Sequence, residues 1–341
     1  MKMKPVALLV GALAPLAVAP ASALDILLTN DDGFETEYIQ ELHKALINAG
    51  HRVVMAAPWG GQSGSGGKIN FLVPILPTSE DSEGGTVPAG SAGVGMNPDP
   101  MAPSTQFYVN GSPADAVLYG MDVAAPMIFG GPPELVISGP NEGNNLGLIT
   151  PHSGTLGAAV TALNKGYPTI AVSAAQVDGT PEEPELIAQL TLMVVESVDG
   201  KKGVKLEPGT GLSVNIPDTD VDPALSVLGD FSFELTRVGK AANIGLQFYE
   251  RLGDSPIANA FGIPPGFPFP GVSVEIPYTA AGHPLDDDKK SEGNVLDDLV
   301  VTVSPIQGTY QADDKAEKKV KKDLKDLFKS KKSGKSKKSK K

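Results

Sequence analysis

Short apolar segments alternate with helix-like segments along the first two thirds of the chain. The apolar run Ile26–Thr29 precedes Tyr38–Ala49, in which apolar residues recur three and four positions apart, as on one face of a helix. The same alternation continues with strand-like Arg52–Ala56, Glu134–Ser138, Thr169–Ser173 and Gly211–Ile216, and with helix-like Thr155–Asn164 and Pro184–Val198. Strands that alternate with helices predict an α/β fold with a Rossmann-like, doubly wound and mostly parallel sheet.

Two regions interrupt this alternation. Residues 77–104 are rich in Gly, Pro and Ser and lack periodicity, so we expect a mobile insertion loop. Residues 225–305 contain strand-like pieces between Gly- and Pro-rich connections, namely Phe231–Arg237, Gly271–Ile276 and Leu299–Val303. They predict a C-terminal β-rich annex, which either supports oligomerisation or shapes a pocket.

The N-terminus has the organisation of a cleavable signal peptide. Lys2 and Lys4 precede an apolar stretch, and the small residues Ala21–Ala23 supply a cleavage site. We therefore expect residues 1–23 to be removed and the protein to be periplasmic or secreted. The sequence contains no cysteine, so an exported protein of this sequence relies on its core and not on disulfides.

Charge divides the remainder into an acidic body and a basic tail. Residues 25–314 hold 12 Lys and Arg against 37 Asp and Glu, whereas residues 315–341 hold 14 Lys against three acidic residues. An acidic body argues against a specific nucleic-acid partner for the fold. The tail is expected to be largely disordered after a short amphipathic helix, whose apolar residues are Val320, Leu324, Leu327 and Phe328. It either aids solubility or contacts an anionic surface.

The segment Asn30–Gly33 carries the first candidate chemistry. It places Asp31 and Asp32 directly after the first apolar strand. Ligands of open α/β sheets bind beyond the carboxyl ends of the strands, and two adjacent carboxylates are best tolerated when a cation neutralises both. The alternative is a solvated turn of Asp-Asp-Gly composition.

Three further loops carry polar residues. Ser138–Gly147 follows the Glu134–Ser138 strand, and Pro58–Gly67 follows the second strand without the Lys-Ser/Thr ending of a Walker loop. In His152–Ala159, Ser153 or Thr155 stands at a helix start. Such a residue is either a simple N-cap or part of a phosphate site, because free N–H groups and the helix dipole attract anions.

Together these loops resemble the SurE family of survival-protein nucleotidases and acid phosphatases. The matching segments are Asn30–Gly33, Gly111–Val117, Ser138–Asn145, Ser153–Thr155 and Val214–Pro217. The resemblance is specific from about Asp25 to Pro217 and loose beyond it. It implies a SurE-like fold and a homo-oligomer, either a dimer or a tetramer.

The resemblance also implies a divalent-metal-dependent phosphomonoesterase that hydrolyses nucleoside 5′- or 3′-monophosphates and other phosphate esters. Carried over residue by residue, the catalytic residues are Asp31, Asp32 and Asn141, the metal ligands are these three with Ser63, and the phosphate-binding residues are Asn145, Ser153, Gly154 and Thr155. Oxygen donors without imidazole or thiolate favour Mg²⁺ or Mn²⁺ over zinc.

The chain departs from the family pattern in the loop after the second strand. Gln62 stands where the family usually has a basic residue, and Trp59 stands where an aspartate is common. Trp59 either covers the core or stacks on a base. Two other functions remain open at this point: an exported nucleotide- or phosphate-binding protein without turnover, and a phospho-acceptor of the receiver type.

Overall fold

The structure is a computed structural model that describes residues 23–175, 183–200, 204–207, 209–219, 227–296, 299–310 and 314–324. Most of the predicted signal peptide and the tail beyond Leu324, including Leu327 and Phe328, lie outside the described residues. Among the residues that are described, no helix is long and apolar enough to span a bilayer.

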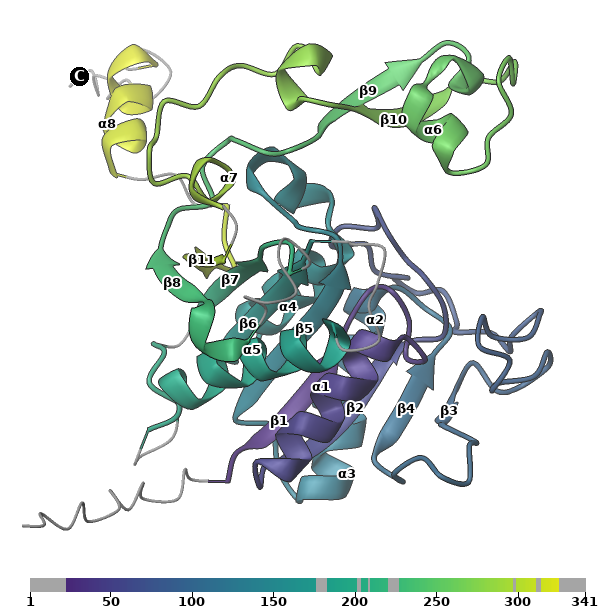
Figure 1. Ribbon diagram of the computed structural model, residues 1–341. Coiled ribbons are helices and arrows are strands. Elements are labelled where there is room, and N and C mark those ends of the chain that lie inside the picture. Colours follow the sequence, from purple (N-terminus) through teal and green to yellow (C-terminus); the bar gives the residue numbers. More distant parts are fainter. Residues whose placement is uncertain are drawn as a thin grey trace, which may run out of the picture.

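A nine-stranded sheet forms the centre of the molecule (Figure 1), in the order β3-β4-β2-β1-β5-β6-β7-β11-β8. Its strands are β1 (Asp25–Thr29), β2 (Arg52–Pro58), β3 (Val94–Met96), β4 (Gln106–Val109), β5 (Leu135–Glu142), β6 (Thr169–Ala174), β7 (Thr210–Ile216), β8 (Ser232–Leu235) and β11 (Val300–Gln307). The six strands from β4 to β7 pair in parallel, whereas β3 with β4 and β11 with β7 pair antiparallel. The predicted mostly parallel α/β sheet is confirmed.

Helices cover both faces of this sheet. On one face α1 (Glu37–Asn48) packs beside α5 (Glu183–Val198). On the other, α2 (Pro113–Tyr119) packs beside α4 (Gly154–Asn164) and continues through a π-helical turn into α3 (Ala125–Phe129). The short helices α6 (Pro256–Ala260), α7 (Glu292–Val295) and α8 (Asp314–Asp323) lie in the C-terminal third.

Strand β1 shows how the sequence builds these layers. Alternate side chains of a strand point to opposite faces of the sheet. Ile26 and Leu28 accordingly belong to the core under α1 and α5, and Leu27 belongs to the core under α2 and α4. All three are fully buried, so β1 is the continuous apolar run expected of a central parallel strand.

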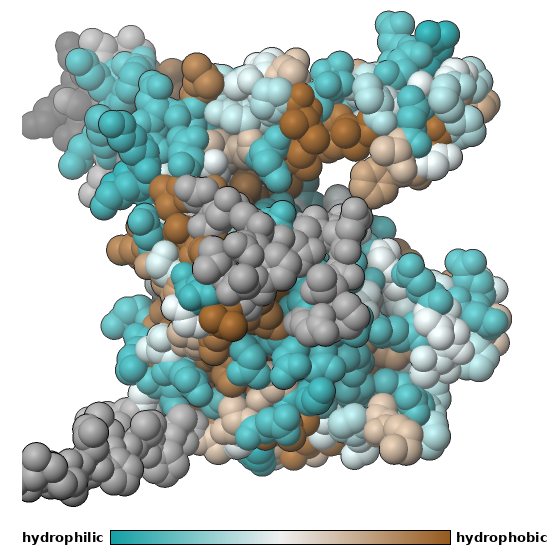
Figure 2. Space-filling view, viewed as in Figure 1, coloured by the Kyte–Doolittle hydropathy of each residue, from teal (hydrophilic) through white to brown (hydrophobic). Residues whose placement is uncertain are grey.

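The C-terminal third does not form one separate annex. Strands β8 and β11 extend the main sheet, so the predicted annex is smaller than residues 225–305. Among the described residues of this third, only β9 (Gly245–Tyr249) and β10 (Gly271–Glu275) form a sheet of their own. This antiparallel pair lies at the end of an arm above the body (Figure 1), and apolar patches interrupt its hydrophilic surface (Figure 2).

The insertion at residues 77–104 is largely irregular, as expected, but it is anchored to the body. Strand β3 pairs with the sheet through β4. Val87 is fully buried and belongs to the same core cluster as Phe34 and Tyr108. A side chain inserted in the core fixes the middle of the insertion against the body.

Candidate active site

The turn after β1 presents two carboxylates at the carboxyl edge of the sheet. Asn30 closes this turn, because its amide donates to the Gly33 carbonyl at 2.8 Å and its side-chain oxygen accepts from the Gly33 N–H at 3.2 Å. Gly33 adopts φ +116°, a left-handed conformation that glycine adopts with little strain. The sequence Asn-Asp-Asp-Gly thus forms the turn that places Asp31 and Asp32 at this edge.

Asp31 is buried and held by the start of α4. Its side chain is 3% exposed, and the Thr155 hydroxyl donates to its Oδ1 at 2.5 Å. Burial raises the pKa of Asp31, while the Thr155 hydroxyl and the backbone N–H groups of Thr155 and Gly154 oppose that rise. The first N–H groups of α4 therefore face a carboxylate of this chain.

Asp32 is partly exposed beside it. The Glu142 N–H donates to Asp32 Oδ2 at 3.1 Å. Burial, and after it the neighbouring charge of Asp31, raises the pKa of Asp32 to about 8. Two carboxylates in this environment resist being charged together, so a bound cation would stabilise the pair.

The loop at the end of β5 places Asn141 against the same edge. Asn141 pairs with Ser173 in the register of β5 and β6. Its amide nitrogen donates to the Gly143 carbonyl at 2.5 Å. With the nitrogen engaged in that bond, the side-chain oxygen remains as the group that can bind a cation.

The predicted phosphate-binding residues lie at the start of α4 and opposite it. Ser153 is the N-cap of α4, because its Oγ accepts from the Leu156 N–H at 3.2 Å. The fully buried Thr155 directs its hydroxyl to Asp31, so in this structure it positions a carboxylate. A Cβ on Gly154 would lie only 2.7 Å from the Asp31 Cβ, so a glycine at this position lets α4 approach Asp31 closely.

Asn145 is connected to this group through residues that the sequence analysis did not assign. Its amide donates to Ser173 Oγ at 2.9 Å and to Thr155 Oγ1 at 3.4 Å. The Asn215 side-chain oxygen accepts from the Asn145 backbone N–H at 2.9 Å. Asn215 lies within the Val214–Pro217 motif, and this motif could have identified it as a site residue from the sequence. No motif surrounds Ser173, so the sequence gave no sign of its role.

The loop after β2 brings Ser63 to the same region. The Gln62 N–H donates to the Asp31 backbone carbonyl at 2.7 Å, and the Gly66 N–H donates to the His152 carbonyl at 3.0 Å. Ser63 is exposed on this loop. The hydroxyl of Ser65, a residue missed from sequence, is buried and has no hydrogen-bond partner among the described residues.

The donor set fits a hard cation. Ser65 Oγ and Asp31 Oδ2 each lie 2.8 Å from the point that a Cβ on Gly154 would occupy, so both oxygens pack closely against the start of α4. In the described part of the chain, no three His, Cys, Asp or Glu side chains form a metal-binding group. A cation at Asp31 and Asp32 would therefore take its other ligands from hydroxyl and amide oxygens and from water, as Mg²⁺ does.

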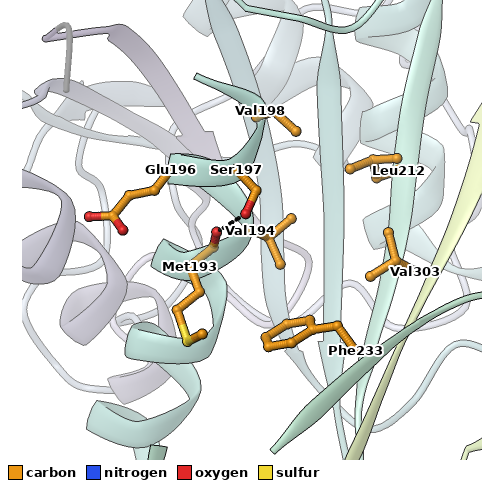
Figure 3. Close-up of a pocket in the computed structure, with 8 residues that line it drawn as sticks. All are labelled: Met193, Val194, Glu196, Ser197, Val198, Leu212, Phe233 and Val303. Carbon is orange, nitrogen blue, oxygen red and sulfur yellow. Dashed lines mark hydrogen bonds between the residues drawn. The ribbon is translucent and has the colours of Figure 1, made fainter. Parts of the chain in front are cut away.

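A pocket of about 210 Å³ opens directly beside Asp32, between Trp59 of the loop after β2 and Glu83 of the insertion. Trp59 also packs against the main core, so it both covers the core and lines this pocket. A larger hollow of about 520 Å³ lies between α5 and strands β7, β8 and β11 (Figure 3). Its lining is mostly apolar, and none of the predicted site residues contributes to it.

Comparison with known proteins agrees with this geometry. The family model "Survival protein SurE" matches residues 26–243. The 5′-nucleotidase SurE of Solidesulfovibrio magneticus is 35% identical over 200 residues, which cover 59% of this chain and 68% of that protein. An acid phosphatase of Yarrowia lipolytica is 34% identical over 218 residues, which cover 59% of each chain.

A solved structure extends the similarity to almost the whole fold. The crystal structure of the SurE protein from Aquifex aeolicus superposes with a TM-score of 0.59 at 26% identity, covering 89% of this chain and 98% of that one. The family match spans β1, β5 and α4, the elements that carry the carboxylate pair, Asn141 and the helix start. This chain belongs to the SurE family of survival proteins.

Proposed function

We propose that the chain is a phosphoric monoester hydrolase that acts on nucleoside 5′- or 3′-monophosphates. The observation that carries this proposal is the pair Asp31 and Asp32 at the end of β1, facing the start of α4 and the loop after β5. The names 5′-nucleotidase and acid phosphatase of its relatives support the same reaction class.

A divalent cation, Mg²⁺ or Mn²⁺, would be held by Asp31, Asp32, Ser63 and Asn141. When bound, it neutralises the two carboxylates, polarises the phosphoryl group and acidifies water. The oxygen-only donors of these residues support this assignment.

The residues of the chain orient this site. Thr155 fixes Asp31, and the Glu142 N–H fixes Asp32, so both carboxylates are aligned before substrate arrives. Ser153, Gly154 and Asn145 would bind the phosphate oxygens. Pre-aligned groups lower the entropic cost of reaching the transition state.

The test is phosphate release from a panel of nucleoside monophosphates and small phosphate esters. The protein is first stripped with a chelator, and metals are then restored one at a time. Release that requires Mg²⁺ or Mn²⁺ supports the hydrolase. Binding of nucleotides without release from any compound, in the presence of each metal, would instead identify an exported binding protein.

We also propose that the chain forms a homo-oligomer through the β9–β10 arm. Large apolar side chains are exposed there, namely Phe248, Phe261, Phe269 and Val272. Exposed apolar surface of this kind marks an association site. Light scattering of the purified protein, compared with a Phe248→Ser variant, should show a smaller species for the variant; identical masses would remove the arm from the interface.

Two proposals concern the ends of the chain. If the protein is exported and its signal peptide is cleaved, N-terminal sequencing should show a mature protein that begins at Leu24. A protein that retains Met1 would contradict export.

The second proposal concerns the basic tail. Helix α8 exposes Val320, and Leu324 immediately after it is also exposed. We propose that the tail from Lys315 contacts anionic surfaces, so its deletion should abolish salt-sensitive sedimentation with anionic vesicles and leave turnover unchanged; equal sedimentation would exclude this role.

A further inference from the structure

The insertion at residues 77–104 forms one wall of the pocket beside Asp32. Glu83 and Gly84 lie on this wall, and Trp59 and Gly60 lie on the wall formed by the loop after β2. The pocket volume of about 210 Å³ is below the ~300–1,000 Å³ that whole drug-sized ligands occupy. It therefore suits one part of a substrate whose phosphate lies at Asp32.

Glu35 fixes the position of this wall. Its carboxylate accepts hydrogen bonds from Ser82 Oγ at 2.9 Å, from the Gly84 N–H at 2.8 Å and from the Thr86 N–H at 2.9 Å. Val87, immediately after these residues, is buried in the core. Glu83 lies between residues that are held on both sides, so its backbone is fixed at the pocket.

The pocket carries negative charge without a compensating cation in its lining. Asp32, Glu35 and Glu83 line it, and no Lys or Arg does. The Glu35 carboxylate accepts three hydrogen bonds, whereas Glu83 is exposed. Glu83 and Asp32 line the same small pocket, so the charge of Glu83 lies close to the catalytic edge.

Trp59 gives the opposite wall a flat apolar surface. Its indole Nε1 is buried and has no hydrogen-bond partner in the part of the chain that the structure describes. Trp59 is the single tryptophan of the sequence. Its fluorescence therefore reports directly on occupation of this pocket.

On the basis of the hydrolase function above, we propose that this pocket receives the leaving group of the substrate, and that Glu83 selects leaving groups without negative charge. Trp59 is the surface on which a nucleoside base packs. The substrate class is thus the phosphomonoesters of uncharged alcohols such as nucleosides, and phosphoanhydrides are disfavoured.

The two substrate classes differ in the charge that approaches Glu83. In hydrolysis of AMP, a water oxygen bonds to phosphorus, the bond from phosphorus to the ribose oxygen breaks, and that oxygen takes a proton from the attacking water. The product adenosine is neutral. In hydrolysis of the terminal phosphate of ADP, the corresponding product is the AMP anion. Repulsion between unit charges several ångströms apart near a protein surface changes a rate by about tenfold and weakens with salt.

The experiment compares the full-length protein with Glu83→Gln and with Glu80→Gln. Glu80 is an exposed carboxylate on the same insertion that does not line the pocket, so its variant controls for the change in net charge. Initial rates with AMP and with ADP give kcat/KM for each. Titration of Trp59 fluorescence with AMP and ADP in the presence of Mg²⁺, read immediately after mixing and before appreciable hydrolysis, gives the affinities separately from turnover.

We expect Glu83→Gln to raise kcat/KM for ADP relative to AMP by about tenfold at low salt, and Glu80→Gln to leave the ratio unchanged. Trp59 fluorescence should respond to AMP more strongly than to ADP, and this preference should shrink in Glu83→Gln. Equal ratios in all three proteins, or equal effects of the two substitutions, would overturn the proposal. A fluorescence that responds to neither nucleotide would also overturn it, even where phosphate is released. If Trp59 fluorescence responds more strongly to AMP than to ADP but no phosphate is released, only the hydrolase function would be overturned.

Discussion

Glu292 provides a direct test of the interior of the fold, because it is a buried carboxylate that connects α7 to the catalytic edge. It is fully buried, and its oxygens accept from Ser304 Oγ at 2.8 Å and from the Gly147 N–H at 3.1 Å. Gly147 ends the Asn-rich loop that follows β5. Burial is the largest effect on this carboxyl and raises its pKa from 4.5 to about 7, against the two hydrogen bonds.

This shift makes stability depend on pH in a defined direction. Between pH 4.5 and 7 the unfolded chain has lost the Glu292 proton while the folded protein still holds it, so the folded state binds more protons. The free energy of unfolding therefore falls as pH rises through this range. A shift of the pKa from 4.5 to about 7 corresponds to a contribution of about 3 kcal/mol to the free energy of unfolding. This contribution is fully present below pH 4.5 and is lost above pH 7.

Glu292→Gln removes the titration and keeps the shape. The Gln oxygen can accept from the Gly147 N–H, and its amide can donate to Ser304 Oγ, whose hydroxyl then turns to Thr236 Oγ1 at 2.8 Å. Urea unfolding from pH 4 to pH 8, followed by circular dichroism, gives the free energy of each protein. We expect the difference between the free energies of unfolding of wild type and variant (wild type minus variant) to fall by about 3 kcal/mol from pH 4 to pH 8.

An exposed carboxylate provides the control for this measurement. Glu207→Gln, at an exposed position, should show a nearly constant difference from wild type over the same pH range. If the Glu292→Gln difference were equally constant, burial would not control this carboxyl and the reasoning would be wrong.

Two substitutions on α4 test the packing of the site. Gly157→Ala places a Cβ 1.9 Å from a backbone carbonyl oxygen of the loop after β2. We expect it to cost about 1–3 kcal/mol of stability and most of the turnover, measured by thermal unfolding and phosphate release. Gly67→Ala, whose Cβ meets open space, is the control and should change both measurements little. Thr155→Val deletes the hydroxyl that holds Asp31 and should weaken Mn²⁺ binding about 10–100-fold by calorimetry. Thr161→Val, which loses only a hydrogen bond to a helix carbonyl, should bind Mn²⁺ as wild type does; equal losses in both variants would show that Asp31 is not positioned by Thr155.

The sequence predicted the parts of the fold that depend on local pattern. The buried run of β1 and the apolar stripe of α1 were both located to within one residue at each end. Strand β11 shows the limit, because its antiparallel pairing with β7 joins residues far apart in the chain and no local pattern specifies it. The missed strand β4 is only four residues long and follows the irregular insertion.

The candidate site shows the same division. The carboxylates were predicted because they follow a buried strand at the edge of the sheet, and Asn141 was predicted from the resemblance of its loop to the SurE family. That the Thr155 hydroxyl faces Asp31 could not be predicted, because it depends on how closely α4 approaches β1. The pocket beside Asp32 was equally hidden, since it requires Glu35 to hold an insertion about fifty residues further along the chain, as the Gly84 N–H bond shows.

The central claim is that Asp31 and Asp32 hold a divalent cation that phosphate release requires. The most direct measurement is phosphate release from AMP by the chelator-stripped protein before and after Mn²⁺ is restored, in parallel with Asp32→Asn. The account predicts no release without metal, recovery with it, and no recovery in Asp32→Asn although that variant unfolds cooperatively. Full release in excess chelator, or from a folded Asp32→Asn protein, would contradict it.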